Sequence, residues 1–383
     1  MVNQKRLLDE FVTLAMFDSE SLHEKSISMY LYDKLVGLGL EVYMDKAGSL
    51  IADSDDSSGN IYGILKGDLE GEPILFSAHM DTVSPGKGKK VVVHRDGKVT
   101  SDGTSVLGAD DITGIVAILE MLTVIKEEGL PHPDIEVTFF IAEEMYCKGS
   151  SVFDYSRIKS KHAYTLDLDG KIGRIANSAP SIIQFEVSIE GKSAHAGFEP
   201  ENGISAIMIA SQAISGLKLG RVDAQTTVNI GTITGGTGKN IVPGHVMVQG
   251  EVRSLDRDAA LSAVERIKSK FEGAAIQCGA KAFFTSEEMV RAYKVDENSF
   301  VIQRYAEALN TLGLGKPEII TSFGGSDNNN FCQHGIEGVV IANAMNNVHT
   351  VNEYFYIEDL VRSSEIVLRL ATGIGNGKPI NIG

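Results

Sequence analysis

The 383-residue sequence has few cysteines, little proline and no long apolar run. Its three cysteines, Cys147, Cys278 and Cys332, are odd in number and far apart. This spacing excludes a disulfide framework and a two-cysteine zinc knuckle, so we expect buried free thiols. The nine prolines and the 43% of hydrophobic residues against 22% of charged ones argue against a disordered chain.

Membrane and nucleic-acid partners are also disfavoured. No apolar stretch approaches the roughly 18 residues that a membrane-spanning helix needs. The N-terminal segment MVNQKRLLDEFVTLAMFDSESLHEK lacks the apolar core of a secretory signal, so we expect a cytoplasmic protein. Basic residues are scarce, with 35 Lys and Arg against 51 Asp and Glu and a net charge of −16. Such a surface repels phosphate backbones, although part of the acidity can belong to a metal site.

Apolar runs that alternate with helical patterns predict an α/β domain over residues 1–180 and 291–383. EPILFSAHMD and DIEVTFFIAEE predict buried strands, and TGIVAILEMLTVIKEEG predicts a helix that is apolar on all sides and ends at Gly129. Buried strands between helices indicate a sheet covered on both faces. Polar residues at the carboxyl ends of such strands lie where open α/β sheets bind ligands.

Residues 181–290 follow a different pattern. IIQFEVSIEGKSAHAG, TTVNIGTITGG and HVMVQGEVRSLD alternate apolar and polar residues, and two helical segments accompany them. This alternation predicts a smaller α+β domain with a one-sided antiparallel sheet, inserted into the α/β domain.

Imidazole and carboxylate groups recur at five expected strand ends or loops, without thiolates, which suits Zn²⁺ or a related dication. A two-metal site needs a bridging carboxylate and a further carboxylate that accepts a proton from water. Adjacent glutamates can supply a ligand and a base, because side chains diverge along an extended backbone. Each motif alone is weak, since an Asp pair before a helix is more often a cap. Together they indicate a site: His79-Met80-Asp81, Asp110-Asp111, Glu143-Glu144, Asp167-Leu168-Asp169 and His349.

Five segments carry a resemblance to a known family. FSAHMDTVSPG, LGADDITGIVAILEML, FFIAEEMYCKGS, AYTLDLDG and NNVHTVNEY resemble, in this order, the metal-site motifs of the co-catalytic zinc exopeptidases, the superfamily of peptidase T, carboxypeptidase G and aminoacylase. The resemblance spans nearly the whole chain, and AYTLD and GKNIVPG are most similar to the tripeptidase T branch. It implies a zinc-exopeptidase catalytic domain with a central mixed sheet, interrupted by a ferredoxin-like lid and dimerisation domain.

The resemblance also implies two Zn²⁺ ions, although Co²⁺ or Mn²⁺ fits the same ligand types. His79, Asp110 and Asp167 would hold one ion, and Asp110, Glu144 and His349 the other. Asp110 would bridge them, with a cis peptide bond before Asp111. From the residues alone, Asp167 and Asp169 are both candidates because they share a face of the strand. The family motif selects Asp167.

The catalytic groups come from the same resemblance. Glu143 would be the general base and acid, and Asp81 the partner of His79, an arrangement that the His-x-Asp spacing allows. His195, in GKSAHAG, would reach the partner subunit's active site and stabilise an oxyanion. Asn240 would contact the substrate near the scissile bond, and Arg253 would bind its carboxylate. The backbone N–H groups of Gly324 and Gly325, in SFGGSDNNNF, can also cradle a carboxylate, although a plain turn explains them equally well.

We therefore expect a homodimeric metallopeptidase that hydrolyses short peptides. The alternative is an N-acyl amino acid amidohydrolase on the same two-metal site, because the chain is shorter than tripeptidases and its GGSDNNN loop departs from theirs. A non-catalytic metal-binding or peptide-binding protein is a rival from another class. The presence of Glu143 and of every implied ligand argues against that rival.

Overall fold

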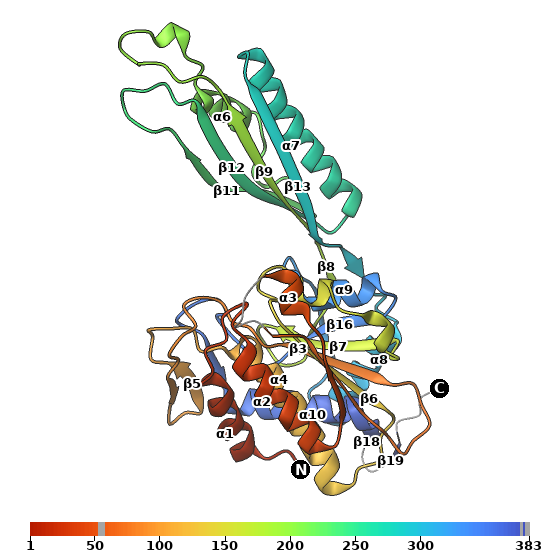
Figure 1. The fold of residues 1–383 in the computed structure, drawn as a ribbon. Helices are drawn as coiled ribbons and strands as arrows, with labels where there is room; N and C mark the ends of the chain where they lie inside the picture. The colour runs from red at the N-terminus through yellow and green to blue at the C-terminus, as the bar shows by residue number, and fades with distance from the viewer. Residues whose placement is uncertain (53–57, 376–377, 380–383) are drawn as a thin grey trace. The chain divides into compact units, whose positions relative to one another are not determined.

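The apolar runs of the α/β part form one mixed sheet in the computed structural model, which describes residues 1–52, 58–375 and 378–379 (Figure 1). Strands β3, β6, β7 and β16 pair in parallel, whereas β1, β2 and β8 join antiparallel to their neighbours. Within the described residues the sheet has nine strands, in the spatial order β1 (Glu41–Met44), β2 (Ile61–Leu65), β6 (Ile135–Phe140), β3 (Ile74–His79), β7 (His162–Leu168), β16 (Glu337–Ala342), β8 (Arg174–Ala179) and β14 (Tyr293–Lys294), with β15 (Glu318–Thr321) parallel to β8.

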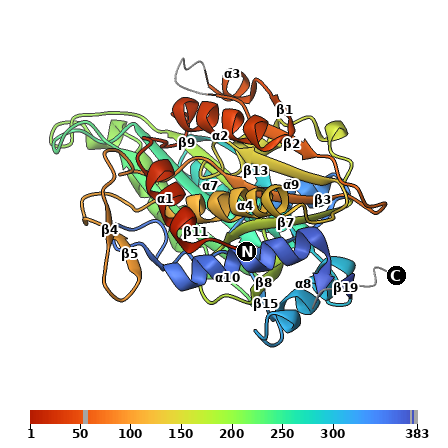
Figure 2. The same cartoon turned by 90° about the horizontal axis from the view of Figure 1, so that it is seen from below.

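Helices cover both faces of this sheet. The long helix α4 lies against β3 and β7, with α1 and α10 packed beside it (Figure 2). On the opposite face α9 contacts β7 and β16, and Phe331 packs there with Leu75 and Phe140. The helices are α1 (Gln4–Ala15), α2 (Lys25–Leu38), α3 (Ala47–Ile51), α4 (Ala109–Glu128), α5 (Lys148–Ser151), α8 (Phe300–Thr311), α9 (Asp327–Gln333) and α10 (Ile357–Thr372).

The central elements follow from their sequences. Every residue of β3 and β6 is buried, as continuous apolar runs predict for strands covered on both faces. Helix α4 is buried from Ala109 to Leu122 because it lies between the sheet and other helices. It ends at Gly129, whose φ of 59° suits a left-handed cap. Shorter elements complete this part: a small sheet of β17 (Tyr354–Tyr356), β5 (Lys98–Ser101) and β4 (Val91–Val93), the pair β18 (Ile374–Gly375) and β19 (Lys378–Pro379), and the 3₁₀ turn Tyr155–Arg157.

The chain divides into two compact units. The first comprises residues 1–178, 294–322 and 326–383, and the second comprises residues 179–293 and 323–325. Within the second unit an antiparallel sheet carries two helices on one face, as the alternating pattern predicts. Its elements are β10 (Gly220–Arg221), β11 (Thr226–Gly235), β12 (His245–Ser254), β9 (Ser181–Glu190) and β13 (Lys281–Val290), in spatial order, with α6 (Ala206–Ser215), α7 (Arg257–Gln277) and the 3₁₀ turn Pro200–Asn202.

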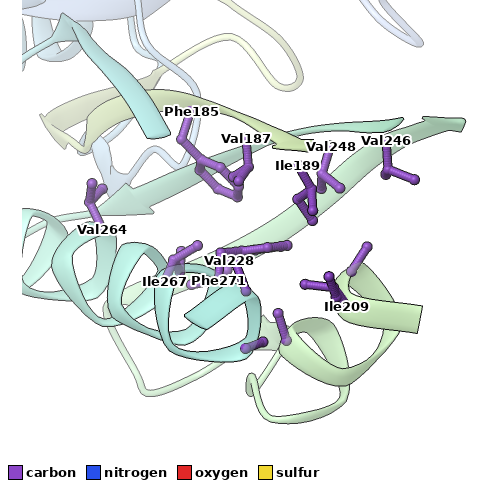
Figure 3. Packing of buried hydrophobic residues seen from close by; sticks show 14 of the residues in the cluster. Phe185, Val187, Ile189, Ile209, Val228, Val246, Val248, Val264, Ile267 and Phe271 are labelled. Atoms are coloured by element: carbon purple, nitrogen blue, oxygen red, sulfur yellow. The ribbon is translucent and has the colours of Figure 1, made fainter. Parts of the chain in front are cut away.

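A separate hydrophobic core holds the second unit together. Phe185 and Val187 from β9 and Val248 from β12 point toward Ile267 and Phe271 of α7 (Figure 3). The alternate residues of the same strands are partly or fully exposed. The two helices are capped by side chains: Ser205 accepts the N–H of Met208 at the start of α6, and Asp256 accepts two N–H groups at the start of α7.

Two details of the sequence interpretation are wrong. Cys278 is exposed at the end of α7, so only Cys147 of the three thiols is fully buried and Cys332 is intermediate. The strand expected to end in two glutamates stops at Phe140, before Glu143. Among the described residues, no helix is long and apolar enough to cross a membrane.

Candidate metal centre

The candidate ligands gather at one edge of the large sheet. His79 is the last residue of β3, and Asp167 lies one residue before the end of β7. Glu144 follows β6, and His349 lies in the turn after β16. These strands are parallel, so their carboxyl ends meet at the same edge, where such sheets bind ligands. Asp110 joins them from the start of α4.

Asp110 lies between two imidazoles. Its Oδ1 is 3.0 Å from Nε2 of His79, and its Oδ2 is 3.2 Å from Nε2 of His349. Each carboxylate oxygen therefore faces a different histidine, as a carboxylate that bridges two metals must. The peptide bond between Asp110 and Asp111 is cis, which confirms the expectation from the resemblance.

Two further carboxylates complete the two ligand groups. Oε2 of Glu144 is 3.0 Å from Nε2 of His349, and Oδ1 of Asp167 is 3.9 Å from Nε2 of His79. Asp111 is also near His79 and Asp167: a ring nitrogen of His79 and one carboxylate oxygen each of Asp111 and Asp167 lie within 4.8 Å of one another. Both oxygens of Asp111 already accept hydrogen bonds, from the side chain of Asn343 at 2.5 Å and from the N–H of His79 at 3.1 Å. Asp111 therefore holds the backbone of His79 and the side chain of Asn343, whereas the two oxygens of Asp110 face the two imidazoles.

The Glu143–Glu144 segment is a turn, so the expected extended backbone is wrong here. Ala142 has a φ of 49°, and the chain bends at Glu143 before α5 begins. The side chains of Glu143 and Glu144 still contact different partners. Glu144 contacts His349, whereas Oε2 of Glu143 is 4.0 Å from Nε2 of His79 and its Oε1 accepts the thiol of Cys147 at 3.3 Å. The sequence shows the glutamate pair but cannot show the left-handed residue before it.

Neighbouring carboxylates raise the pKa of both histidines at this site. Burial lowers the pKa of His79, but hydrogen bonds with Asp110 and Asp81 outweigh it and hold that pKa well above its usual value. Hydrogen bonds with Asp110 and Glu144 raise the pKa of His349 to about 10. Burial raises the pKa of Asp110, but these imidazoles hold it well below the usual range.

The other carboxylates repel one another. Burial and the charge of Asp167 raise the pKa of Glu143 well above its usual value, and burial and Asp110 do the same to Asp167. Burial also raises the pKa of Glu144, whose Oε1 is buried without a hydrogen-bond partner among the described residues. A cluster of buried carboxylates with an unsatisfied oxygen is stabilised by divalent cations. The donor set of imidazole nitrogens and carboxylate oxygens fits zinc and related metals.

Asp81 contacts His79 through its backbone more closely than through its carboxylate. Nδ1 of His79 is 2.9 Å from the carbonyl oxygen of Asp81 and 3.5 Å from Oδ1. The carboxylate instead accepts the N–H groups of Glu143 and Glu144, at 2.9 and 3.1 Å. Asp81 therefore contacts the imidazole, as expected, and also holds the turn that carries the two glutamates.

Two peptidase family models match parts of this chain. The peptidase dimerisation domain family of M20 matches residues 177–277, and peptidase family M28 matches residues 60–198. The uncharacterised protein YqjE of Bacillus subtilis is 42% identical over 371 residues, which cover 97% of this chain and 98% of that protein. Peptidase T of Fusobacterium nucleatum is 26% identical over 336 residues, which cover 77% of this chain and 79% of that protein.

Two solved structures share the fold over nearly the whole chain. An aminopeptidase PepT from Bacillus cereus has a TM-score of 0.88 and 38% identity, and a tripeptidase from Staphylococcus aureus has a TM-score of 0.92 and 35% identity. Each comparison covers 97% of this chain and 98% of the other. The chain belongs to the peptidase T-like M20 family. It is a metallopeptidase, and two candidate metal-binding groups that share His79, one with Asp111 and Asp167 and one with Asp110 and Glu144, indicate a dinuclear metal site.

The remaining predicted site residues of this M20 peptidase lie in its second unit. His195 is exposed, and its Nδ1 accepts the N–H groups of Gly197 and Phe198, each at 3.1 Å. A ring nitrogen that accepts two N–H groups carries no proton, so the neutral imidazole has its proton on Nε2. Asn240 is also exposed, and its carbonyl accepts the N–H of Ala196.

Arg253 lies beside the glycines of the 323–325 segment within the second unit. Its Nη1 donates to the carbonyl oxygen of Phe323 at 3.0 Å. Its Nε and Nη2 donate to the carboxylate of Glu251, at 2.7 and 3.3 Å. Gly324 and Gly325 follow Phe323 directly. The guanidinium is half-buried and held in place, and a substrate carboxylate would meet it already paired with Glu251.

Four acidic or thiol groups around the metallopeptidase centre were missed from the sequence: Glu24, Cys147, Asp327 and Glu353. Glu353 is buried and accepts the N–H groups of Leu107, Gly108 and Asp110, at 2.7–2.8 Å. Its place in NNVHTVNEY, four residues after His349, was a signal for it. Asp327, at the start of α9, accepts the hydroxyl of Ser150 at 2.5 Å. Glu24 carries no comparable sequence signal, since it lies between ordinary loop residues.

Proposed function

We propose that this M20 peptidase hydrolyses the amide bond of short peptides. The reaction would use two divalent metal ions, for which zinc is the first candidate, and Glu143 as the general base and acid. The observation that carries the proposal is the placement of Asp110, whose two oxygens face His79 and His349 separately. Asp167 and Glu144 complete the two ligand groups.

The metals, when bound, polarise the substrate carbonyl and lower the pKa of the attacking water. Glu143 takes a proton from that water and passes it to the leaving amine. Its carboxylate suits this task because it is 8% exposed and its pKa is raised, so it can hold a proton between the two steps. The thiol of Cys147 fixes Oε1, which leaves Oε2 on the side of His79.

The second unit supplies the proposed substrate contacts. His195 would donate from Nε2 to the developing oxyanion, because its Nδ1 is already an acceptor. In a homodimer this histidine would serve the partner subunit's site, and the match to a peptidase dimerisation domain supports that assembly. Asn240 would contact the substrate near the scissile bond. Arg253, with Gly324 and Gly325, would bind a terminal carboxylate, a task that suits a guanidinium.

The substrate class rests on two relatives whose names include aminopeptidase and tripeptidase. We therefore propose tripeptides with a free amino terminus as the preferred substrates. A panel of free tripeptides, free dipeptides and N-acyl amino acids, assayed with Zn²⁺, Co²⁺ or Mn²⁺, tests the class and the metal together. Turnover of N-acyl amino acids alone would favour the amidohydrolase alternative. A cytoplasmic location stays a prediction.

The role of Glu143 is tested by Glu143→Ala and Glu143→Gln. Both variants should lose at least roughly 100-fold in kcat, because general-base catalysis supplies a factor of about 10²–10⁴. Both should still bind two metals, since Glu143 is not a ligand in the proposed site. Metal content by elemental analysis and steady-state kinetics on the best tripeptide measure the two effects. Near-normal turnover in either variant would show that another group is the base.

A further inference from the structure

Two buried carboxylates bind three successive backbone N–H groups in the turn after β6. Ala142 donates to Oε1 of Glu24 at 3.0 Å. Glu143 donates to Oδ1 of Asp81 at 2.9 Å, and Glu144 donates to Oδ2 of Asp81 at 3.1 Å. Glu24 and Asp81 are both 0% exposed. The proposed base and a proposed ligand thus lie on a turn in which three successive amides are held by side chains.

This turn needs such partners because the chain leaves the sheet there. The pairing of β6 with β3 ends at Phe140, so the following amides have no strand to bind. Ala142 has a left-handed φ of 49°, which is uncommon for a residue other than glycine. Buried N–H groups must be paired, because an unpaired donor away from water costs free energy. Glu24 supplies this partner to Ala142.

Glu24 reaches the turn through the loop before α2. Thr82 donates its N–H to the carbonyl oxygen of Ser19 at 2.9 Å, and the hydroxyl of Ser21 donates to Oδ2 of Asp81 at 2.7 Å. The N–H of Leu22 donates to the same Oε1 of Glu24 that accepts Ala142, at 2.8 Å. The loop therefore lies along the segment that carries Asp81 and fixes the Glu24 side chain behind the turn.

We propose that Glu24 is a positioning residue for the metal centre: by accepting the N–H of Ala142 it fixes the turn that presents Glu143 and Glu144. The inference rests on the proposed function, because the roles of these two glutamates are parts of it. Glu24 acts through the turn: the residue it holds, Ala142, directly precedes the proposed base Glu143 and lies two residues before the proposed ligand Glu144. Its effect should therefore reach turnover and the metal that Glu144 binds, while the metal between His79 and Asp167 is spared.

The accepting oxygen, and not the negative charge, is the feature that this role requires. Oε2 of Glu24 is buried without a hydrogen-bond partner among the described residues, whereas Oε1 accepts both N–H groups. Glu24→Gln keeps an accepting oxygen at the same reach and removes the charge. Glu24→Asp keeps the charge and withdraws the acceptor by one methylene. Glu20→Asp is the matched control, because Glu20 lies in the same loop and accepts the N–H of Gly86 at 2.7 Å.

Each full-length variant is compared with the wild type by steady-state kinetics and by stepwise Zn²⁺ titration of the metal-free protein. For Glu24→Asp we expect kcat and the affinity for one of the two zinc ions to fall by about 10–100-fold, the usual effect of losing an outer hydrogen bond at a metal site. KM and the affinity for the other zinc should change little. Glu24→Gln and Glu20→Asp should resemble the wild type in all of these quantities.

Three results would overturn the inference. One is a Glu24→Asp variant with wild-type kcat and both wild-type zinc affinities. Another is an equal loss in Glu24→Asp and Glu24→Gln, which would show that the charge matters. The third is a parallel loss of both zinc ions with a lower melting temperature, which would show a general structural role. A wild-type protein that binds two zinc ions but hydrolyses no peptide would instead count against the proposed function.

Discussion

At the scale of single residues, the candidate centre consists of proposed ligands and of groups that hold their segments in place. His79, Asp110, Glu144 and His349 contact one another, and the backbone N–H groups of the first three are held by neighbouring carboxylates. Asp111, Asp81 and Glu353 accept backbone N–H groups of the ligand segments. Sequence motifs reveal the proposed ligands, because imidazole and carboxylate groups are the side chains that bind such metals. The second set is defined by hydrogen bonds, which the order of residues does not show.

Cys147 is a residue of the second kind. Its thiol donates to Oε1 of Glu143 and is buried there, so it should orient the base. Cys147→Ser keeps a donor and should retain turnover, whereas Cys147→Ala removes it and should lower kcat by roughly tenfold, with little change in KM. Cys332→Ala is the control, because that thiol contacts the carbonyl of Gly338. Equal kcat values for Cys147→Ala and the wild type would show that the hydrogen bond is unimportant.

Lys89 gives a prediction about pH and stability. Its amine is buried and donates to the carbonyl oxygens of Phe17 and Gly86, and burial lowers its pKa to about 8. In the unfolded chain the pKa is about 10.4. Between these values the unfolded chain binds the proton and the folded chain does not, so stability from this group rises with pH, by roughly 3 kcal/mol at most.

Lys89→Met should remove this rise. Urea unfolding at several pH values between 7.5 and 9.5 measures the free energy of unfolding of the variant and the wild type, with the exposed Lys87→Met as the control. The difference between wild type and Lys89→Met should grow with pH, while Lys87→Met should run parallel to the wild type. A constant difference for Lys89→Met would mean that the amine titrates normally in the folded protein.

At the scale of elements, two glycines in helices have opposite environments. A Cβ on Gly149, in α5, would lie 1.9 Å from the carbonyl oxygen of Ile141, whereas a Cβ on Gly273, in α7, would meet nothing within 4 Å. Gly149→Ala should therefore push α5 away from the end of β6, lowering both stability and kcat. Gly273→Ala should raise stability by up to about 1 kcal/mol, the helix propensity difference. Thermal unfolding and kinetics compare the two, and a stable, active Gly149→Ala variant would refute the close contact.

The sequence predicted those elements whose pattern is regular. The apolar runs of β3 and β6 and the all-apolar α4 are confirmed, because burial on every side leaves a continuous signal. The alternation in β9 and β12 is confirmed for the same reason on one face. Strand β13 was missed, because its exposed edge carries charged residues such as Glu287 and Glu288. The bend at Glu143 was missed, because a left-handed alanine leaves no mark in the sequence.

The residues of the candidate site also divide into those that the sequence predicted and those that it missed. Four of the five proposed metal ligands lie at or after strand ends, which are predictable, and the structure brings the five side chains together. The choice of Asp167 over Asp169 came from the family motif, and it is Asp167 that lies near His79. Glu24 and Asp327 come from a loop and a helix start with no such regularity. Their roles require the positions of amides and hydroxyls in three dimensions.

At the scale of the whole molecule, the two units have separate hydrophobic cores, and only the first unit contains the proposed metal ligands. The proposed metal ligands belong to the first unit, whereas the second unit is held by the cluster of Phe185, Val187 and Phe271 with its neighbours. Ligands that bind the folded state alone stabilise it by mass action. A metal should therefore stabilise the first unit directly and leave the second unit unchanged.

Removal of the metals tests this division. Calorimetry of the metal-loaded protein should show two transitions, and EDTA should lower the one that belongs to the first unit, on the order of 10 °C, because buried carboxylates such as Glu144 and Asp167 then repel without compensation. The other transition should stay in place. Asp110→Asn, which lacks the bridging carboxylate, should respond weakly to EDTA and keep the same second transition. One transition that moves as a whole would show that the units unfold together, and no movement would show that the centre holds no stabilising metal.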